Sequence, residues 1–285
     1  MRIVNSSYIT KVIRQLIGEC RQNLLQALFR KSLLRNEDRL KTLRVVKELR
    51  RVGLVVLHNF VPQERCAELL GHVDAALEQY QSFVQISADG ADYRLFGLDA
   101  FDDQVRRVTF DPLVIGALRY YQNASRYEGF ALCSRLLPVA GNLGSGGGWH
   151  RDSPARQQTK LMLYLTDVGD NNGPFQYLVG THRGLDVIRC SLKFGYDLNQ
   201  YRFSDGEVAR LLDAEPSRLY TLNAPAGTAV LFDSRAIHRG MPMTAGKRYT
   251  ITSYLWFDQP APNHVREWTI EAQQRNGCRG GASHR

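Results

Sequence analysis

The feature that most constrains this chain is a short stretch, Gly148 to Asp152, together with a histidine far downstream, His238. His150 and Asp152 are two residues apart, and on an extended strand such side chains project from the same face. An imidazole and a carboxylate placed in this way can bind one metal ion from one side. A second histidine, on a strand near the other end of the domain, completes two histidines and one carboxylate. This ligand set leaves coordination positions open and is typical of non-haem Fe(II) oxygenases.

His-x-Asp alone arises easily by chance, so the prediction needs a second pattern. That pattern begins ten residues after His238. Arg248 and Thr250 lie in a run of alternating β-forming residues. An arginine in such a strand is costly to bury unless it meets an anion. Its planar guanidinium group can donate two parallel hydrogen bonds to a carboxylate, and the hydroxyl of Thr250, on the same face, can add a third. The two patterns together predict a site for an acid that chelates iron at one end and is anchored at the other.

Five further stretches occur in a fixed order around these residues. They are Trp149–Asp152, Leu163–Val168, Asn171–Phe175, Val179–Arg183 and Ala226–Ser234, followed by His238 and Arg248. In this order they resemble the phytanoyl-CoA dioxygenase (PhyH-like) family of Fe(II)/2-oxoglutarate oxygenases. The resemblance covers roughly residues 50 to 258. It implies a mainly β fold with flanking helices, a double-stranded β-helix (jelly roll, cupin-like), with iron bound by His150, Asp152 and His238.

The resemblance also implies the cofactors and the reaction. Arg248 is expected to hold 2-oxoglutarate, with Thr250 and Tyr164 as further candidates for contact with this cosubstrate. Fe(II), 2-oxoglutarate and O2 together are expected to hydroxylate a C–H bond, with release of succinate and CO2. Related halogenases have a small residue in place of the carboxylate, so Asp152 favours hydroxylation over halogenation.

Positive charge is concentrated at the start of the chain. Residues 1–52 hold thirteen Lys or Arg against four Asp or Glu, whereas the remaining residues hold 24 of each kind. A basic segment on a neutral domain indicates a docking appendage. A nucleic-acid partner is not expected, because the catalytic portion carries no net positive charge.

The same N-terminal segment has a helical pattern. Between residues 8 and 51 leucines and isoleucines recur at three- and four-residue steps, with basic residues between them. Residues 1–52 are therefore predicted as a basic amphipathic helical extension. It either lies on an anionic membrane surface or packs on the catalytic domain or another subunit. The oligomeric state stays open.

The expected location is cytoplasmic, with possible peripheral attachment to the inner face of the membrane. The chain has no run of eighteen apolar residues and no signal-peptide pattern at its N-terminus. Its five cysteines are scattered, without a Cys-x-x-Cys pair, and are expected to be reduced thiols.

The rest of the chain is predicted as one dioxygenase domain, residues 53–260, and a tail, residues 261–285. A strand near residues 53–60 precedes a helix that ends at about residue 79, and a second helix begins near Asp111. Glycines of segment 141–148 are expected to give a mobile loop and close backbone approach beside the metal. Residues 183–222 interrupt the β-pattern and are interpreted as a partly helical lid, with packing on the outer sheet as the alternative.

The substrate is the least constrained part of the prediction. The basic segment favours an anionic or membrane-associated molecule, such as an acidic sugar of lipopolysaccharide or another lipid-linked glycan, while a small metabolite or acyl-thioester is also compatible. A second class of function is a non-catalytic β-helix module that binds a metabolite or a metal. It predicts a damaged ligand set or a missing carboxylate anchor. A zinc hydrolase with the same ligands has no need of Arg248 and Thr250.

Overall fold

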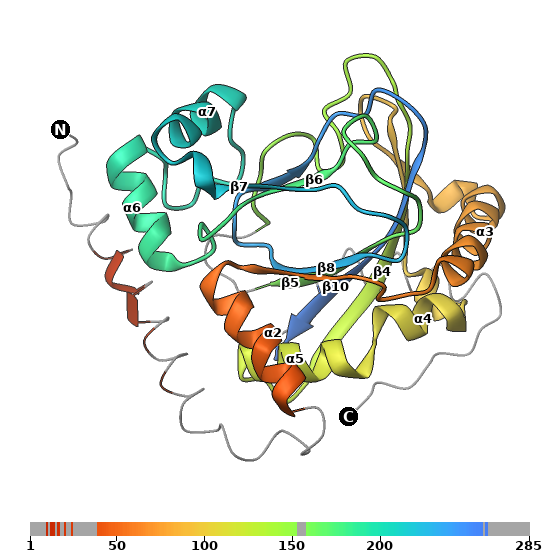
Figure 1. Ribbon diagram of the computed structural model, residues 1–285, viewed down its shortest axis with the longest axis horizontal. Coiled ribbons are helices and arrows are strands. Elements are labelled where there is room, and N and C mark those ends of the chain that lie inside the picture. Colours follow the sequence, from red (N-terminus) through yellow and green to blue (C-terminus); the bar gives the residue numbers. More distant parts are fainter. Residues whose placement is uncertain are drawn as a thin grey trace.

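The computed structural model describes residues 39–152, 158–258 and 260–261, together with eight separate positions between residues 10 and 24. Most of the predicted amphipathic segment and nearly all of the predicted tail therefore lie outside the described residues. The described chain forms two antiparallel sheets that face each other, with helices on their outer sides (Figure 1).

Among the described elements one helix comes first, and the strands follow with helices between them. The strands are β1 (Leu54–Leu57), β2 (Gln85–Ile86), β3 (Asp92–Phe96), β4 (Tyr127–Leu136), β5 (Thr159–Tyr164), β6 (Phe175–Leu178), β7 (Leu219–Leu222), β8 (Ala229–Asp233), β9 (His238–Gly240) and β10 (Arg248–Phe257). The helices are α2 (Arg39–Arg51), α3 (Gln63–Gln79), α4 (Asp103–Thr109), α5 (Pro112–Gln122), α6 (Gly184–Phe194) and α7 (Asp205–Ala214). Short 3-10 turns cover Gln81–Phe83, Leu98–Ala100 and Pro216–Arg218.

The larger sheet has seven strands in the order β1-β8-β5-β10-β4-β3-β2. Its central strand, β10, pairs with β4 on one side and β5 on the other, so that Thr250 lies between Ser134 and Tyr164. Because side chains alternate along a strand, Arg248 and Thr250 share one face of the sheet. Ile251 and Leu255 lie on the opposite face, in the main hydrophobic core.

That main core lies between the larger sheet and helices α2 to α5, which cover its outer face in Figure 1. Helix α2 belongs to it, because Val46 and Leu49 are buried among the core residues. The last turns of the predicted extension thus pack on the catalytic domain. The division of the chain at residue 53 stays a prediction, since nothing else in the described residues marks a boundary there.

The smaller sheet has the order β7-β6-β9, and the inner faces of the two sheets meet in a second core. Phe175 and Tyr177 of β6 pack there against Phe232 of β8 and Tyr164 of β5. Isolated bridges join His150 both to His238 and to Arg202, so the segment around His150 continues this sheet beyond β9. Both histidines are thereby placed at one edge of the space between the sheets.

Helices α6 and α7 account for most of the segment that was interpreted as a lid. They cover a third apolar cluster, in which Leu178 and Ile237 from the smaller sheet meet Cys190 of α6 and Leu211 of α7. These contacts lie on the outer face of the smaller sheet. The end of the segment, Leu219–Leu222, is strand β7, and the lid stays a prediction.

Two further features of the described residues concern membrane-spanning helices and cysteine thiols. Among the residues described, no helix is both long enough and apolar enough to cross a membrane. The cysteines in this part of the chain, Cys20, Cys66, Cys133 and Cys190, all have free thiols.

Candidate metal centre

Backbone pairing brings the two histidines together from distant parts of the chain. The amide of His150 donates to the carbonyl of His238 at 2.9 Å, and the amide of His238 donates back to the carbonyl of His150 at 2.8 Å. Two residues further on, the amide of Asp152 donates to the carbonyl of Ser234 at 3.0 Å. The segment from His150 to Asp152 therefore runs antiparallel to the segment that enters β9, and its alternate side chains share one face.

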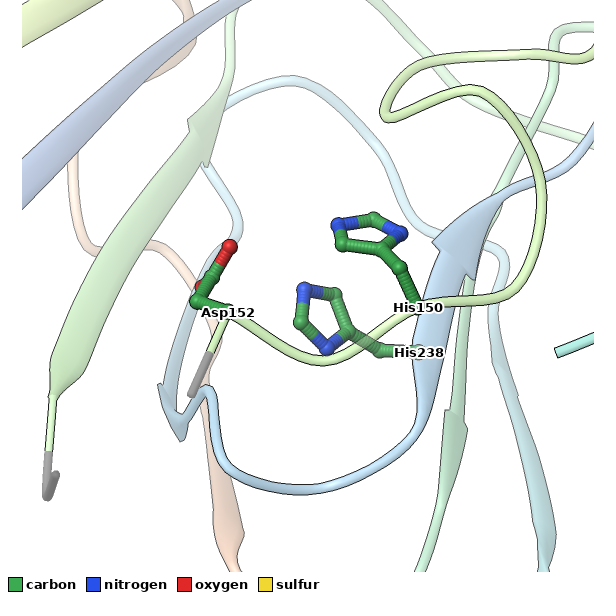
Figure 2. A group of neighbouring side chains, drawn as sticks. All are labelled: His150, Asp152 and His238. Atoms are coloured by element: carbon green, nitrogen blue, oxygen red, sulfur yellow. The ribbon is translucent and has the colours of Figure 1, made fainter. Parts of the chain in front are cut away.

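The side chains of His150, Asp152 and His238 converge on one point (Figure 2). One nitrogen from each ring and one carboxylate oxygen all lie within 4.8 Å of one another, a spacing that can hold a metal ion. The ring centres of the two histidines are 4.3 Å apart. The structure thus brings together the three residues that were singled out as metal ligands.

The second nitrogen of each ring is held by the backbone. Nδ1 of His150 is 2.9 Å from the carbonyl oxygen of Gly148, and Nδ1 of His238 is 2.9 Å from that of Ala236. A carbonyl oxygen only accepts hydrogen bonds, so Nδ1 carries the proton and Nε2 keeps its lone pair. Such an arrangement fixes both the tautomer and the direction of a ligating imidazole.

Burial keeps both imidazoles neutral. It lowers the pKa of His150 to about 4, and the nearby Asp152 carboxylate only partly offsets this effect. Burial and the charge of the neighbouring His150 lower the pKa of His238 to about 3. Neutral imidazole is the form that binds metals, so neither ring has to lose a proton at neutral pH.

Asp152 has a partner that sequence reasoning missed, Lys160 on β5. Its ammonium nitrogen lies 2.7 Å from Oδ2 of Asp152 and 4.0 Å from the centre of the Tyr254 ring. Burial alone favours the neutral acid, but the charge of Lys160, joined by that of the two histidines once acid protonates them, holds the pKa of Asp152 well below its ordinary value. The carboxylate is therefore ionised, as a metal ligand must be. A lone lysine in a strand gives no signal of such a role.

Arg248, the expected carboxylate anchor, is only 2% exposed. One of its terminal nitrogens donates to the carbonyl of Gly173, while its Nε has no hydrogen-bond partner among the described residues. A buried guanidinium with an unsatisfied donor is costly, and a carboxylate that accepts two of its N–H groups removes that cost. The donor set therefore fits the distal carboxylate of an acid such as 2-oxoglutarate.

The other two cosubstrate candidates differ in what their hydroxyls contact. Oγ1 of Thr250 is 2.9 Å from Oγ of Ser134, a residue on the neighbouring strand that sequence reasoning did not single out. The hydroxyl of Tyr164 accepts from the amide of Phe175 at 2.9 Å and donates to the carbonyl of Leu222 at 3.3 Å. Burial raises the pKa of Tyr164 to about 12. Tyr164 thus connects the larger sheet to the smaller one.

The glycine-rich segment 141–148 passes directly over the histidines. At Gly146, φ is +88°, and a Cβ built there overlaps the ring of His150. At Gly144, φ is +75°, and a Cβ overlaps the carbonyl oxygens of Gly240 and Met241. The expected close backbone approach beside the metal site is thus seen in the structure, and only glycine permits it at these positions.

Comparison with known proteins shows relatives of this chain in sequence and in fold. Residues 49–249 match the family model of phytanoyl-CoA dioxygenase (PhyH). Ectoine dioxygenase from Bordetella parapertussis is 25% identical over 212 residues, which cover 68% of each chain.

Solved structures with the same fold include two iron enzymes. The epimerase SnoN, in complex with Fe3+, α-ketoglutarate and a nogalamycin compound, aligns with a TM-score of 0.57 and 16% identity over 79% of this chain and 89% of its own. EctD from S. alaskensis with bound iron aligns with a TM-score of 0.56 and 14% identity over 75% of each chain. They confirm the predicted double-stranded β-helix.

The family match spans most of the chain, and it confirms the resemblance that the motifs indicated. It also confirms the expected cofactors, Fe(II), 2-oxoglutarate and O2. The chain belongs to the phytanoyl-CoA dioxygenase family and is an iron- and 2-oxoglutarate-dependent dioxygenase.

Proposed function

We propose that His150, Asp152 and His238 hold the iron, and that the enzyme hydroxylates a C–H bond of a small organic molecule. The observation that carries this proposal is the convergence of two ring nitrogens and one carboxylate oxygen within 4.8 Å. Hydrogen bonds from both rings to backbone carbonyls preset the ligating nitrogens. Three ligands on one side leave the remaining positions for cosubstrate and oxygen.

Arg248 and Thr250 are proposed to anchor the 5-carboxylate of 2-oxoglutarate. The buried guanidinium supplies charge and two parallel donors, and its unsatisfied Nε supports this role. The hydroxyl of Thr250, steadied by Ser134, supplies a further donor on the same face. Tyr164 stays a prediction as a direct contact, because its hydroxyl is already engaged with Phe175 and Leu222.

The bound iron and cosubstrate supply the oxidising power, consuming O2 and releasing succinate and CO2. The protein residues position the reactants and exclude water. Burial of Arg248 removes competing solvent from the anchor, and the carboxylate of Asp152 occupies a ligand position that a halide needs. The first feature keeps the cosubstrate in a fixed position, and the second favours hydroxylation over halogenation.

A group of aromatic side chains supports a small substrate with an apolar part. Phe130 and Tyr254 stack with ring centres 5.3 Å apart, and Trp256 and Phe96 lie 5.4 Å and 5.7 Å from Phe130. Tyr254 and Trp256 lie on the same face of β10 as Arg248, and both are half-buried. Relatives that act on ectoine or bind a nogalamycin compound also handle small molecules.

A glycolipid or other anionic membrane substrate stays a prediction from the basic charge of residues 1–52. Most of that segment lies outside the described residues. The non-catalytic alternative predicted a damaged ligand set or a missing carboxylate anchor, whereas His150, Asp152, His238 and Arg248 are all present. The candidate ligand atoms of the first three also lie close together.

Anaerobic titration of the metal-free protein with Fe(II) and 2-oxoglutarate tests the proposal through the visible metal-to-ligand charge-transfer band. We expect the band in the wild type, its loss in His150→Ala, and a weaker affinity for 2-oxoglutarate in Arg248→Ala. His182→Ala is the matched control, because His182 is a buried histidine outside the ligand set.

Loss of the band in His182→Ala but not in His150→Ala contradicts the ligand assignment. A folded, iron-loaded wild type without a band removes the cosubstrate from this site. Once the band is established, succinate release in the presence of candidate small molecules identifies the substrate.

A further inference from the structure

Lys160 is a buried ammonium with no role in the site as proposed so far. It lies on β5, where its cross-strand partners are Tyr254 of β10 and Phe232 of β8, and its side chain is 5% exposed. An ammonium group in such a place is stable only if it is paired. Within the part of the chain that the structure describes, its ion-pair partner is Asp152.

The geometry around Lys160 constrains the carboxylate. The ammonium lies 2.7 Å from Oδ2 of Asp152 and 4.0 Å from the centre of the Tyr254 ring. Main-chain hydrogen bonding to Ser234 fixes the backbone of Asp152, but it leaves the carboxylate free to rotate. Pairing one oxygen with a buried cation removes that freedom.

We propose that Lys160, seated on the Tyr254 ring, is the positioning residue for Asp152: it orients this carboxylate and serves as its counter-ion until a metal takes that place. The inference rests on the proposed function of Asp152 as an iron ligand. Lys160 does not touch the reacting atoms. It acts through Asp152, which also has a buried counter-ion while no metal is bound.

A second consequence concerns the charge of the loaded centre. Asp152 neutralises one of the two positive charges of Fe(II), and Lys160 adds one back. The centre then presents two positive charges to 2-oxoglutarate, which is a dianion. In a buried site such charges are weakly screened, so Lys160 also strengthens cosubstrate binding.

The test compares Lys160→Met with Met162→Leu. Met162 lies two residues along β5 on the same face, so Met162→Leu disturbs the packing there without removing charge. Thermal unfolding is measured for each metal-free protein and with saturating Mn2+. The dissociation constant for 2-oxoglutarate is measured by anaerobic titration of the Fe(II)-loaded proteins, together with the position of the charge-transfer band.

We expect Lys160→Met to lower the Tm of the metal-free protein by on the order of 5 °C, and to lower that of the Mn2+-loaded protein by less, since the metal then compensates Asp152. The dissociation constant for 2-oxoglutarate rises about tenfold and the band shifts. Lys160→Arg restores most of the affinity. Met162→Leu leaves both readouts unchanged.

A double-mutant cycle separates pairing from packing. In an Asp152→Asn background, Lys160→Met is expected to cause little further loss of Tm in the metal-free protein. Equal losses with and without metal, an unshifted band, or full additivity in the cycle each overturn the positioning role and leave Lys160 as a packing residue.

Failure of the proposed function gives a different result. If the wild type binds Mn2+ but shows no charge-transfer band, the cosubstrate assignment fails, and the metal-dependent Tm comparison still decides the role of Lys160. A wild type that binds no divalent metal overturns both inferences.

Discussion

At the scale of single residues, the histidines of this protein owe their different properties to their surroundings. His150 and His238 each give Nδ1 to a backbone carbonyl and leave Nε2 free. His182 is also buried, but its Nδ1 has no hydrogen-bond partner among the described residues, and it lies outside the ligand set. Burial alone therefore does not identify a ligand, whereas a backbone-held tautomer beside a carboxylate supports the proposed ligand role.

Gly146→Ala is expected to weaken metal binding at least tenfold, because the added Cβ overlaps the His150 ring and displaces a ligand. The affinity for Mn2+ can be measured by calorimetry. Gly141→Ala is the matched control, since Gly141 lies in the same segment with φ +75° and open space around its Cβ position. If both variants lose affinity equally, backbone strain explains the effect and the close approach does not.

The stability of the metal-free protein is expected to depend on His182 between pH 6.5 and 4. Burial lowers the pKa of His182 to about 4, so in this range the unfolded chain binds a proton that the folded protein does not. Stability therefore falls as the pH falls, by up to about 3 kcal/mol from this residue. Urea unfolding at pH 7.5 and 4.5 measures the change.

His182→Gln is expected to flatten this dependence, while His58→Gln, at an exposed position, leaves it unaltered. A wild-type slope that persists in His182→Gln assigns the effect to other groups, of which His150 and His238 are the first to examine.

At the scale of elements, the sequence predicted strands and capped helices better than it predicted their partners. The expected helix ending near residue 79 is α3, and the helix beginning near Asp111 is α5. Both could be predicted because Pro62 and Asp111 are residues typical of helix starts. In contrast, the burial of α2 and the place of α6 and α7 depend on contacts with distant strands. The pairing of Lys160 with Asp152 could not be predicted for the same reason, since only the folded sheet brings the two residues together.

Leu49→Ala tests whether α2 belongs to the core. Leu49 is fully buried, so its truncation is expected to cost about 2 to 5 kcal/mol of unfolding free energy. Lys47→Ala, on the exposed face of the same helix, should change stability by less than about 0.5 kcal/mol. Both values come from urea denaturation, and similar small losses in the two variants contradict the packing of α2 into the core.

At the scale of the whole molecule, the sequence specified the site more completely than the substrate. The three residues expected to bind iron lie in distant segments that the fold brings together, and Arg248, expected to hold the cosubstrate, is buried on the central strand of the larger sheet. The motif could reveal them because their chemical types are restricted by the metal and the carboxylate. A substrate leaves no comparable pattern in a single sequence, since aromatic and apolar side chains serve both packing and binding.

The uneven charge of the chain predicts a separable function for its N-terminal residues. Removing residues 1–35, which hold seven Lys or Arg against one Glu, is expected to abolish co-sedimentation with anionic vesicles. The effect should disappear at high salt, because charge attraction to a surface is screened. Succinate release should remain. Unchanged sedimentation of the truncated protein rules out membrane attachment through this segment.

The reciprocal backbone pairing of His150 and His238 also has a kinetic meaning. A metal ion held by both side chains acts as a removable cross-link that closes the long loop of chain between them. Unfolding has to break this link before the chain segments around the two histidines can separate. Removal of the metal by a chelator should therefore shorten the lifetime of the folded state in denaturant. The metal centre would then slow unfolding as well as support the reaction.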